Sequence, residues 1–353
     1  MSDTGIISNS SDLKESWDKL LQEKPKLRIR DAAKELGVSE AELLATKCGE
    51  SVTRLTGDWK DLIKSFVELG NVMALTRNDH AVHEKIGKFE HIEFFGPHMG
   101  QVVGKQIDLR LFMSHWHMSF AVEEEVRGET KQSFQFFNQD GSAIFKVYLH
   151  EGGNWAGFET LKERFKSDDQ SAEQDTTPLP EEKEELPDSQ IDLEGFHKGW
   201  EGLQDTHGFY GLLQKYRVSR TQALRLAPSQ YVTRVGNDSA RKVLDAAGAT
   251  ETPIMVFVGN PGNIQIHTGP VKKLMPYEDW YNVMDPDFNL HLRESGIDQS
   301  YIVKKPTKDG LVTALELYDK ENDNIALFFG ERKPGIPELE AWRDIIGNIE
   351  QSK

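Results

Sequence analysis

Apolar side chains recur every three or four positions in the first part of the chain, residues 10–70, which is the spacing of one helix face. Ser39 followed three positions later by Glu42 matches a capping box, in which each residue caps the backbone of the other. Residues 60–70, KDLIKSFVELG, combine helical spacing with a terminal glycine. These patterns predict a helical N-terminal region.

From residue 71 to residue 148 the pattern changes to short runs rich in β-branched and aromatic residues. Asn138-Gln139-Asp140-Gly141 is a hairpin turn signal between two of these runs. Strands this close in sequence favour antiparallel pairing. The predicted strands are 71–76, 91–95, 101–103, 108–112, 118–122, 133–137 and 143–148.

The second half of the chain repeats this order at an offset of about 180 residues. Residues 37–42 align with 217–222, where Ser219 and Gln222 make a second capping-box pattern. Residues 108–111 align with 289–292, and the order of matching segments is kept throughout. We therefore predict an α+β fold built by tandem duplication of one domain, in which helices accompany a large antiparallel sheet.

Residues 167–190 separate the two copies. They are acidic, contain several prolines and have almost no apolar side chains, so they cannot bury enough surface to offset the entropy lost on ordering. The predicted organisation is an N-terminal repeat at 1–166, an acidic linker at 167–190 and a C-terminal repeat at 191–353. A charged recognition segment is the alternative interpretation of the linker.

Charge and composition exclude several classes of protein. The net charge of −16 disfavours nucleic-acid binding, because phosphate contacts require a cationic face. Cys48 is the single cysteine, so no intramolecular disulfide forms, which fits a reducing compartment. The first residues lack a signal-peptide pattern, and no apolar stretch approaches the roughly 20 residues that span a bilayer. We expect a cytoplasmic protein without membrane insertion.

Common enzyme motifs are absent. The sequence has no dinucleotide-binding or phosphate-binding glycine loop, no His-Glu-x-x-His and no Gly-x-Ser-x-Gly. His115 and His117 place two imidazoles on one side of an extended segment, so a divalent metal site is an open alternative, although the sequence offers no obvious third ligand. What the chain does contain is widely separated His, Arg, Lys and aromatic residues. A large planar anion with a central metal needs this mixture, but composition alone does not select it.

Eight segments carry a resemblance to a known family. They are 78–84 (NDHAVHE), 107–112 (IDLRLF), 205–209 (DTHGF), 218–224 (VSRTQAL), 255–260 (MVFVGN), 265–269 (QIHTG), 288–293 (FNLHLR) and 305–307 (KPT). Through them the chain resembles, over nearly its whole length, the cytoplasmic haemin-binding and haemin-degrading proteins of bacterial haem uptake, the HemS, ChuS, ShuS, HmuS and PhuS family. The resemblance implies that haem is bound between the two halves.

The resemblance also implies residue roles. His207 corresponds to the proximal ligand of the haem iron and Arg110 to the distal arginine, and these two are the candidate catalytic residues. His83 matches a residue assigned to a second haem site in some members, although its repeat partner His267 shows that a histidine here can be structural. The remaining implied haem contacts are Arg220, Lys305 and Arg332, which match positions that bind the propionates or line their exit, and Phe112 and Phe257, which match ring-packing positions. Phe329 is a further candidate haem-binding residue.

One segment departs from the family pattern. Similar members often have Gln and Tyr where Leu327 and Phe329 stand in this chain. Two polar groups near the edge of the ligand are therefore missing, and a mechanism that depends on a hydrogen-bond network on that side is in doubt.

Two functions follow from the resemblance and share one pocket. The first is an enzyme of iron acquisition that degrades haem with an external electron donor and releases the iron, by haem oxygenase-like chemistry. The second is a non-enzymatic chaperone or store that accepts haem from an uptake ABC transporter and delivers it to a separate haem oxygenase or reductase system. The sequence does not decide between the two, and our expectation is degradation with a trafficking role alongside it.

Overall fold

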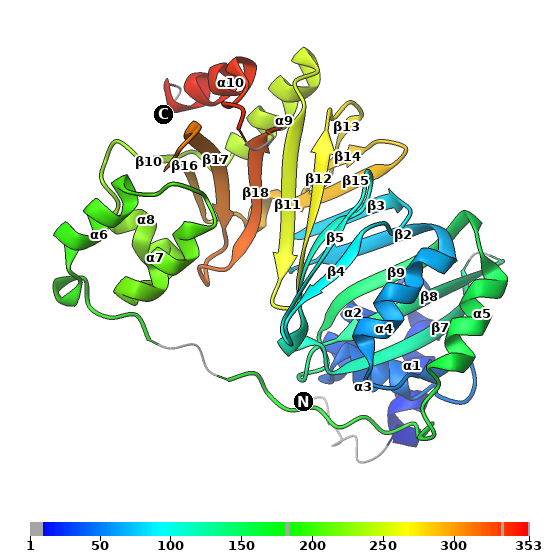
Figure 1. Ribbon diagram of the computed structural model, residues 1–353. Helices are drawn as coiled ribbons and strands as arrows, with labels where there is room; N and C mark the ends of the chain where they lie inside the picture. Colours follow the sequence, from blue (N-terminus) through cyan, green and yellow to red (C-terminus); the bar gives the residue numbers. More distant parts are fainter. Residues whose placement is uncertain (1–9, 127, 181–183, 333–334, 352–353) are drawn as a thin grey trace. The chain divides into compact units, whose positions relative to one another are not determined.

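The computed structural model describes residues 10–126, 128–180, 184–332 and 335–351 (Figure 1). The chain divides into two compact units, each of which takes in a short segment from the other half of the sequence. Unit 1 comprises Met1–Thr76, Lys85–Pro180 and Asn260–Ile264, and unit 2 comprises Arg77–Glu84, Glu181–Gly259 and Gln265–Lys353. The predicted limits 1–166, 167–190 and 191–353 stay our proposal for the domain boundaries.

The first half of the chain runs from helices into a series of strands. Its helices are α1 (Ser10–Glu23), α2 (Ile29–Leu36), α3 (Glu40–Ala45), α4 (Trp59–Lys64) and α5 (Trp155–Arg164), with short 3-10 turns η1 (Ser65–Leu69) and η2 (Met113–His115). Its strands are β1 (Val52–Arg54), β2 (Gly70–Arg77), β3 (Ala81–Gly87), β4 (Ile92–Phe95), β5 (Met99–Val103), β6 (Asp108–Phe112), β7 (Met118–Val126), β8 (Glu129–Phe137) and β9 (Ala143–Gly153).

Unit 1 is built on antiparallel ladders in the order β1-β7-β8-β9-β2 and β4-β5-β6. Phe134 and Phe136 of β8 pack with α4, η1 and α5 on one face, while Phe137 packs with α3 on the other. Because successive strand residues point to opposite faces, a strand covered on both sides is buried at consecutive positions, as β8 is from Gln132 to Phe137, including the polar Gln132, Ser133 and Gln135.

The second half repeats this element order (Figure 1). Its helices are α6 (Leu193–Glu201), α7 (Gly208–Tyr216), α8 (Arg220–Leu226), α9 (Ser239–Thr250) and α10 (Glu340–Gln351), with 3-10 turns η3 (Asp188–Gln190) and η4 (Glu294–Gly296). Its strands are β10 (Val232–Val235), β11 (Ile254–Asn260), β12 (Asn263–Gly269), β13 (Leu274–Tyr277), β14 (Trp280–Met284), β15 (Phe288–Arg293), β16 (Gln299–Thr307), β17 (Gly310–Tyr318) and β18 (Asn324–Gly330).

Unit 2 has the ladders β10-β16-β17-β18-β11 and β13-β14-β15. Helices α9 and α10 pack on one face of the longer ladder, against Leu315 and Leu317 of β17. Helices α6–α8 pack on the other face, against Tyr301 and Tyr318. The predicted α+β fold with a duplicated domain of helices and large antiparallel sheets is therefore confirmed.

The local predictions differ in how closely the structure follows them. The capping box of Ser39 and Glu42 is complete, with both reciprocal hydrogen bonds present. Ser219 likewise accepts a hydrogen bond from the Gln222 backbone, but the Gln222 side chain donates to Leu186 and Asp188 instead. Residues 60–70 form α4 followed by the 3-10 turn η1 rather than one regular helix.

Hydrogen bonds hold the acidic segment at its two ends. Within unit 1, Arg54 donates to the carbonyl groups of Ser171 and Glu173. Within unit 2, Arg225 pairs with Glu185 and Asp188. Most of its described side chains are exposed, as expected for a segment without a core of its own.

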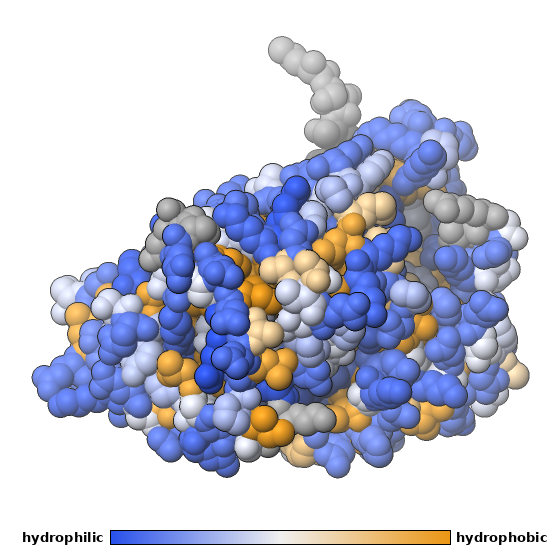
Figure 2. All heavy atoms as spheres, turned by 90° about the horizontal axis from the view of Figure 1, so that it is seen from above, coloured by the Kyte–Doolittle hydropathy of each residue, from blue (hydrophilic) through white to orange (hydrophobic). Residues whose placement is uncertain are grey.

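The face shown in Figure 2 is mainly hydrophilic, and apolar side chains lie on it in small separate groups. Across the described ranges, no helix combines the length and the apolar character that a membrane crossing requires.

Candidate functional site

His207 stands at the start of helix α7, where it is the N-cap residue. Its imidazole is 93% exposed, which leaves the ring open to a ligand. The backbone N–H of His207 donates to the Oδ1 atom of Asp205 at 2.8 Å, so the turn before the helix holds the residue in place. The predicted iron ligand is therefore accessible and is held by the turn before α7.

Asp205 also orients the His207 ring. Its Oδ1 atom lies 2.5 Å from the Nδ1 atom of His207. The backbone and side-chain hydrogen bonds from His207 lower the pKa of Asp205, so the carboxylate stays ionised and accepts a hydrogen bond from the Nδ1–H group. The Nε2 atom is then left as the lone-pair donor, the arrangement found where a carboxylate orients a metal-binding histidine.

A buried ionic cluster lies beside α7. Glu316 on β17 is fully buried and receives two hydrogen bonds from the Arg220 guanidinium, from Nε at 2.9 Å and from Nη2 at 2.8 Å. Lys305 Nζ donates to the same carboxylate at 2.7 Å, and the Tyr318 hydroxyl donates at 2.5 Å. We call Arg220, Lys305, Glu316 and Tyr318 the cationic cluster, because it holds two cations and one carboxylate.

The electrostatics of the cationic cluster are set by burial and by the two cations. Burial would raise the pKa of Glu316, but the Arg220 and Lys305 charges outweigh it and hold that pKa well below its usual range. Burial, together with the nearby Arg220 charge, lowers the pKa of Lys305 to about 8. Near neutral pH the cluster therefore carries one net positive charge.

Phe209 links helix α7 to the cationic cluster. It is buried, and its ring lies 4.4 Å from the Lys305 ammonium and 5.5 Å from the Arg220 guanidinium carbon. Both distances suit cation–π contacts. Because Phe209 follows His207 by two residues on the same helix, it fixes that end of α7 against the two cations.

An apolar strip continues from the cationic cluster along the same face of the sheet. In the ladder, Glu316 lies opposite Leu327 and Leu327 lies opposite Phe257, so these side chains share one face. The rings of Phe257 and Phe329 are 5.1 Å apart and nearly perpendicular. Phe257, Leu327 and Phe329 are half-buried, and they form an apolar surface beside the cationic cluster.

Arg332 follows strand β18 and is half-buried. Its charge acts on Asp205 and on Glu338, and it lowers the pKa of Asp205 as a minor contribution after the hydrogen bonds from His207. The structure thus associates Arg332 with the carboxylate that orients His207.

Arg110 and Phe112 belong to unit 1, on strand β6. Arg110 is 36% exposed and forms an ion pair with Asp108, and its Nη1 atom also donates to the Leu109 carbonyl at 3.0 Å. Burial raises the pKa of Asp108, although the Arg110 charge opposes the rise. Phe112 is half-buried, and its backbone N–H donates to the Gly262 carbonyl at 2.9 Å.

His83 lies in the interior of unit 2. Its side chain is fully buried, and its ring centroid is 4.9 Å from that of Phe288. The His267 ring also stacks on Phe288, with the two ring centroids 3.8 Å apart. A second haem at His83 stays a prediction, and it would require the surrounding side chains to move before the imidazole could reach an iron atom.

His115 and His117 follow strand β6, and His115 closes the turn η2. Partial burial and the nearby His117 lower the pKa of His115. Within the described ranges, no group of three or more His, Cys, Asp or Glu side chains is placed to hold a metal ion.

Sequence reasoning missed three residues that shape this site. Asp205 lies in a segment that matches the family, but the resemblance assigns a role only to His207 in that segment. Glu316 and Tyr318 lie outside the segments that match the family. A lone glutamate in the apolar run ALELY is a signal that could have found Glu316, because a buried charge requires a partner.

The donor set fits a planar amphiphilic anion with a central metal. His207 offers an exposed Nε2 atom, the cationic cluster offers positive charge, and the apolar strip offers a surface for a ring. These features belong to unit 2 and involve helices α7 and α8 together with strands β11 and β16–β18.

Known proteins resemble this chain over most of its length. The family model of the haemin-degrading HemS/ChuX domain matches the chain twice, at residues 37–165 and 217–349. The hemin transport protein HemS of Yersinia enterocolitica is 37% identical over 346 residues, which is 95% of this chain and 97% of that protein.

Two solved structures show the same fold. Holo-PhuS, a heme-binding protein from Pseudomonas aeruginosa, is 43% identical, has a TM-score of 0.95 and is aligned over 97% of this chain and 99% of its own. The heme degrading enzyme ChuS of Escherichia coli O157:H7 is 31% identical, with a TM-score of 0.90 and the same coverage. The chain therefore belongs to the HemS/ChuX family, of which it contains two copies of the domain.

Proposed function

We propose that this protein binds haem through His207 and degrades it with an external electron donor, releasing iron for the cell in the cytoplasm. The observation that carries the proposal is the exposed His207 ring, whose Nδ1 atom is held by Asp205 on the helix that covers the cationic cluster. The printed names of the relatives support it, because PhuS is described as heme-binding and ChuS as a heme degrading enzyme and a heme oxygenase.

Each part of the donor set has a proposed task. His207 Nε2 binds the iron, and Asp205 keeps the ring in the tautomer that leaves Nε2 free. Arg220 and Lys305, with Arg332 beyond them, neutralise the propionates, since Glu316 balances only one of the two cluster charges. Phe257 and Phe329 contact the porphyrin ring. Haem supplies the iron and the redox chemistry, and the chain binds and orients it.

The family resemblance assigns further roles to unit 1. Arg110 is the proposed distal residue, which would donate hydrogen bonds in the haem site, with Phe112 as a ring contact. To act there, Arg110 must turn away from its ion pair with Asp108. The placement of haem between the two halves remains a prediction that rests on the resemblance.

A second candidate function is a chaperone that carries haem from an uptake ABC transporter to a separate haem oxygenase or reductase system. It is favoured by the name of the Yersinia enterocolitica relative, which is a hemin transport protein. The same pocket serves both functions, because binding precedes either degradation or transfer.

Aerobic incubation of the haem complex with an electron donor, in the presence of catalase, distinguishes the two. The degradation proposal predicts loss of the Soret band and formation of a bilin-type product with catalase present. If catalase abolishes bleaching completely, free peroxide causes the damage and the chaperone function is favoured. Arg110→Ala in the same assay tests the distal residue, since haem binding without product formation is expected.

A further inference from the structure

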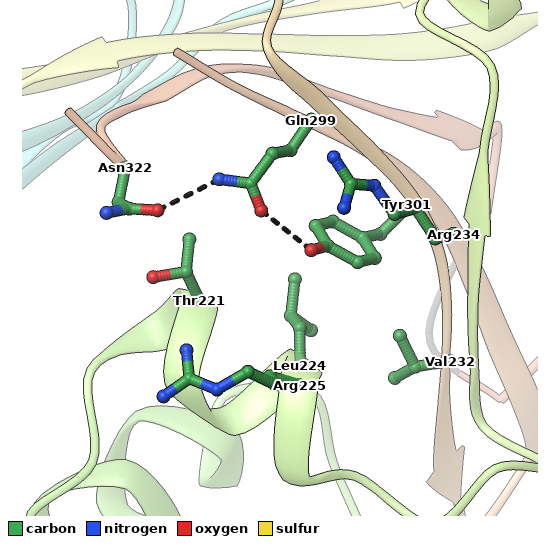
Figure 3. A pocket seen from close by; sticks show the side chains of 8 residues that line it. All are labelled: Thr221, Leu224, Arg225, Val232, Arg234, Gln299, Tyr301 and Asn322. Carbon is green, nitrogen blue, oxygen red and sulfur yellow. Dashed lines mark hydrogen bonds between the residues drawn. The ribbon is translucent and has the colours of Figure 1, made fainter. Parts of the chain in front are cut away.

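A pocket in unit 2 lies between helix α8 and strands β10 and β16 and is lined by residues other than those of the cationic cluster. It is a half-open cavity of about 430 Å³ between α8 and strands β10 and β16 (Figure 3). The residues of the proposed haem site, such as His207 and Lys305, do not line it. Pockets of roughly 300–1,000 Å³ hold small organic molecules, so this volume exceeds what a single oxyanion needs.

One wall of the pocket is apolar. Leu224 of α8, Val232 of β10 and the ring of Tyr301 on β16 face it (Figure 3). Tyr301 is only 8% exposed, and its hydroxyl donates to Gln299 at 2.7 Å. Gln299 in turn donates to Asn322 at 3.0 Å, so this hydrogen-bonded chain fixes the polar rim above the apolar wall.

Two arginines supply positive charge to the pocket. Arg225 is already paired with Asp188 and Glu185. Arg234 is exposed, and its guanidinium lies beside Gln299 and Tyr301 in Figure 3. Within the described residues no hydrogen bond or ion pair engages the Arg234 side chain, although the chain has 58 acidic residues against 42 basic ones. A guanidinium group that has no carboxylate partner can donate two parallel hydrogen bonds to a carboxylate or phosphate group.

We propose that this pocket binds a small organic anion, with its carboxylate or phosphate group on Arg234 and its apolar body against Leu224, Val232 and Tyr301. The proposal is independent of haem binding, because it uses none of the residues assigned to haem. The pocket nevertheless lies close to that site, since the Tyr301 ring is 6.2 Å from the ring of Tyr318 in the cationic cluster.

Binding of phenyl phosphate, benzoate and benzyl alcohol to the full-length protein tests the proposal by ligand-observed NMR titration. We expect saturable binding of at least one of the two anions and none of benzyl alcohol, which has the ring without the charge. The ratio of the two affinities shows whether the pocket prefers a phosphate or a carboxylate group. Absence of saturation by both anions would overturn the proposal, as would equal binding of benzyl alcohol.

Arg234→Gln locates the site. We expect its affinity for the anion to fall by about tenfold or more, because a charge-assisted hydrogen bond is lost. Arg293→Gln is the matched control, since Arg293 is a partly exposed arginine on Trp280 outside the pocket, and it should bind like the wild type. Circular dichroism checks that both variants fold. Equal affinity of Arg234→Gln and the wild type would show that the anion binds elsewhere, which contradicts the proposal.

Discussion

The Oδ1 atom of Asp205 lies 2.5 Å from the Nδ1 atom of His207, while the rest of the His207 ring is exposed to solvent. The Nδ1 atom is therefore hydrogen-bonded to a carboxylate, and the Nε2 atom is exposed to solvent. This is the arrangement in which a protein fixes the tautomer and direction of a metal-binding histidine before the metal arrives.

Asp205→Asn should weaken haemin binding without unfolding the protein. The amide keeps the shape of the side chain, but it removes the charge that orients Nδ1, and loss of such a partner costs about 10–100-fold in metal affinity. Competitive haemin titration measures the change. Glu194→Gln, which removes an exposed carboxylate from α6, is the control and should leave affinity unchanged. Equal affinity in Asp205→Asn would show that the contact does not position the ligand.

Glu316→Gln should destabilise the protein strongly. Glu316 is fully buried and balances Arg220 and Lys305, so its removal leaves two cations close together without a carboxylate. Breaking a buried pair in this way costs about 3–5 kcal/mol of unfolding free energy. Urea denaturation measures the loss. The double variant Glu316→Gln with Lys305→Met should recover part of it, and no recovery would mean that like-charge repulsion is not the cause.

The lowered pKa of Glu316 also predicts how the free energy of unfolding depends on pH. The folded-state pKa of Glu316 lies below the ordinary value of 4.5, so below that pH the unfolded chain binds more protons than the folded chain. The stabilisation is complete above about pH 4.5 and is lost as the pH falls further. Urea midpoints measured down this range should fall more steeply for the wild type than for Glu316→Gln. Parallel curves would contradict the assignment.

Haemin affinity should decrease as the pH rises through about 8, the pKa of Lys305. Above that value Lys305 loses its proton, and the cationic cluster loses the net charge proposed to bind a propionate. Lys305→Arg keeps its charge over this range and should show a flatter profile. Titrations at several pH values compare the two proteins, and the comparison removes the effect of alkaline pH on haemin itself. Identical profiles would exclude Lys305 as a propionate ligand.

Much of the fold could be predicted from the sequence, because the signals are local or repeated. The capping box at Ser39, the hairpin turn at Asn138–Gly141 and the offset of about 180 residues each depend on neighbouring residues or on direct comparison of segments. The prediction was less accurate for residues 60–70, where the second part is a 3-10 turn. The exchange of residues 77–84 and 260–264 between the units has no signal in periodicity.

The candidate site was harder to predict, because its contacts join residues far apart in the chain. Arg220 and Glu316 are separated by 96 positions, and only the fold shows that they meet. The resemblance suggested Arg220 and Lys305 as propionate contacts, and the structure adds that both already share a resident carboxylate. Asp205 is two residues from His207, so a rule for paired Asp and His could have predicted that contact.

Haemin titration followed in the Soret region tests the central claim most directly, with the wild type, His207→Ala and the control His117→Ala, which removes another exposed imidazole. We predict a saturable one-to-one endpoint for the wild type and the control, and an altered spectrum with weaker retention for His207→Ala. If His207→Ala matched the wild type in spectrum and affinity, His207 would not bind the iron, and the account of the site would be contradicted.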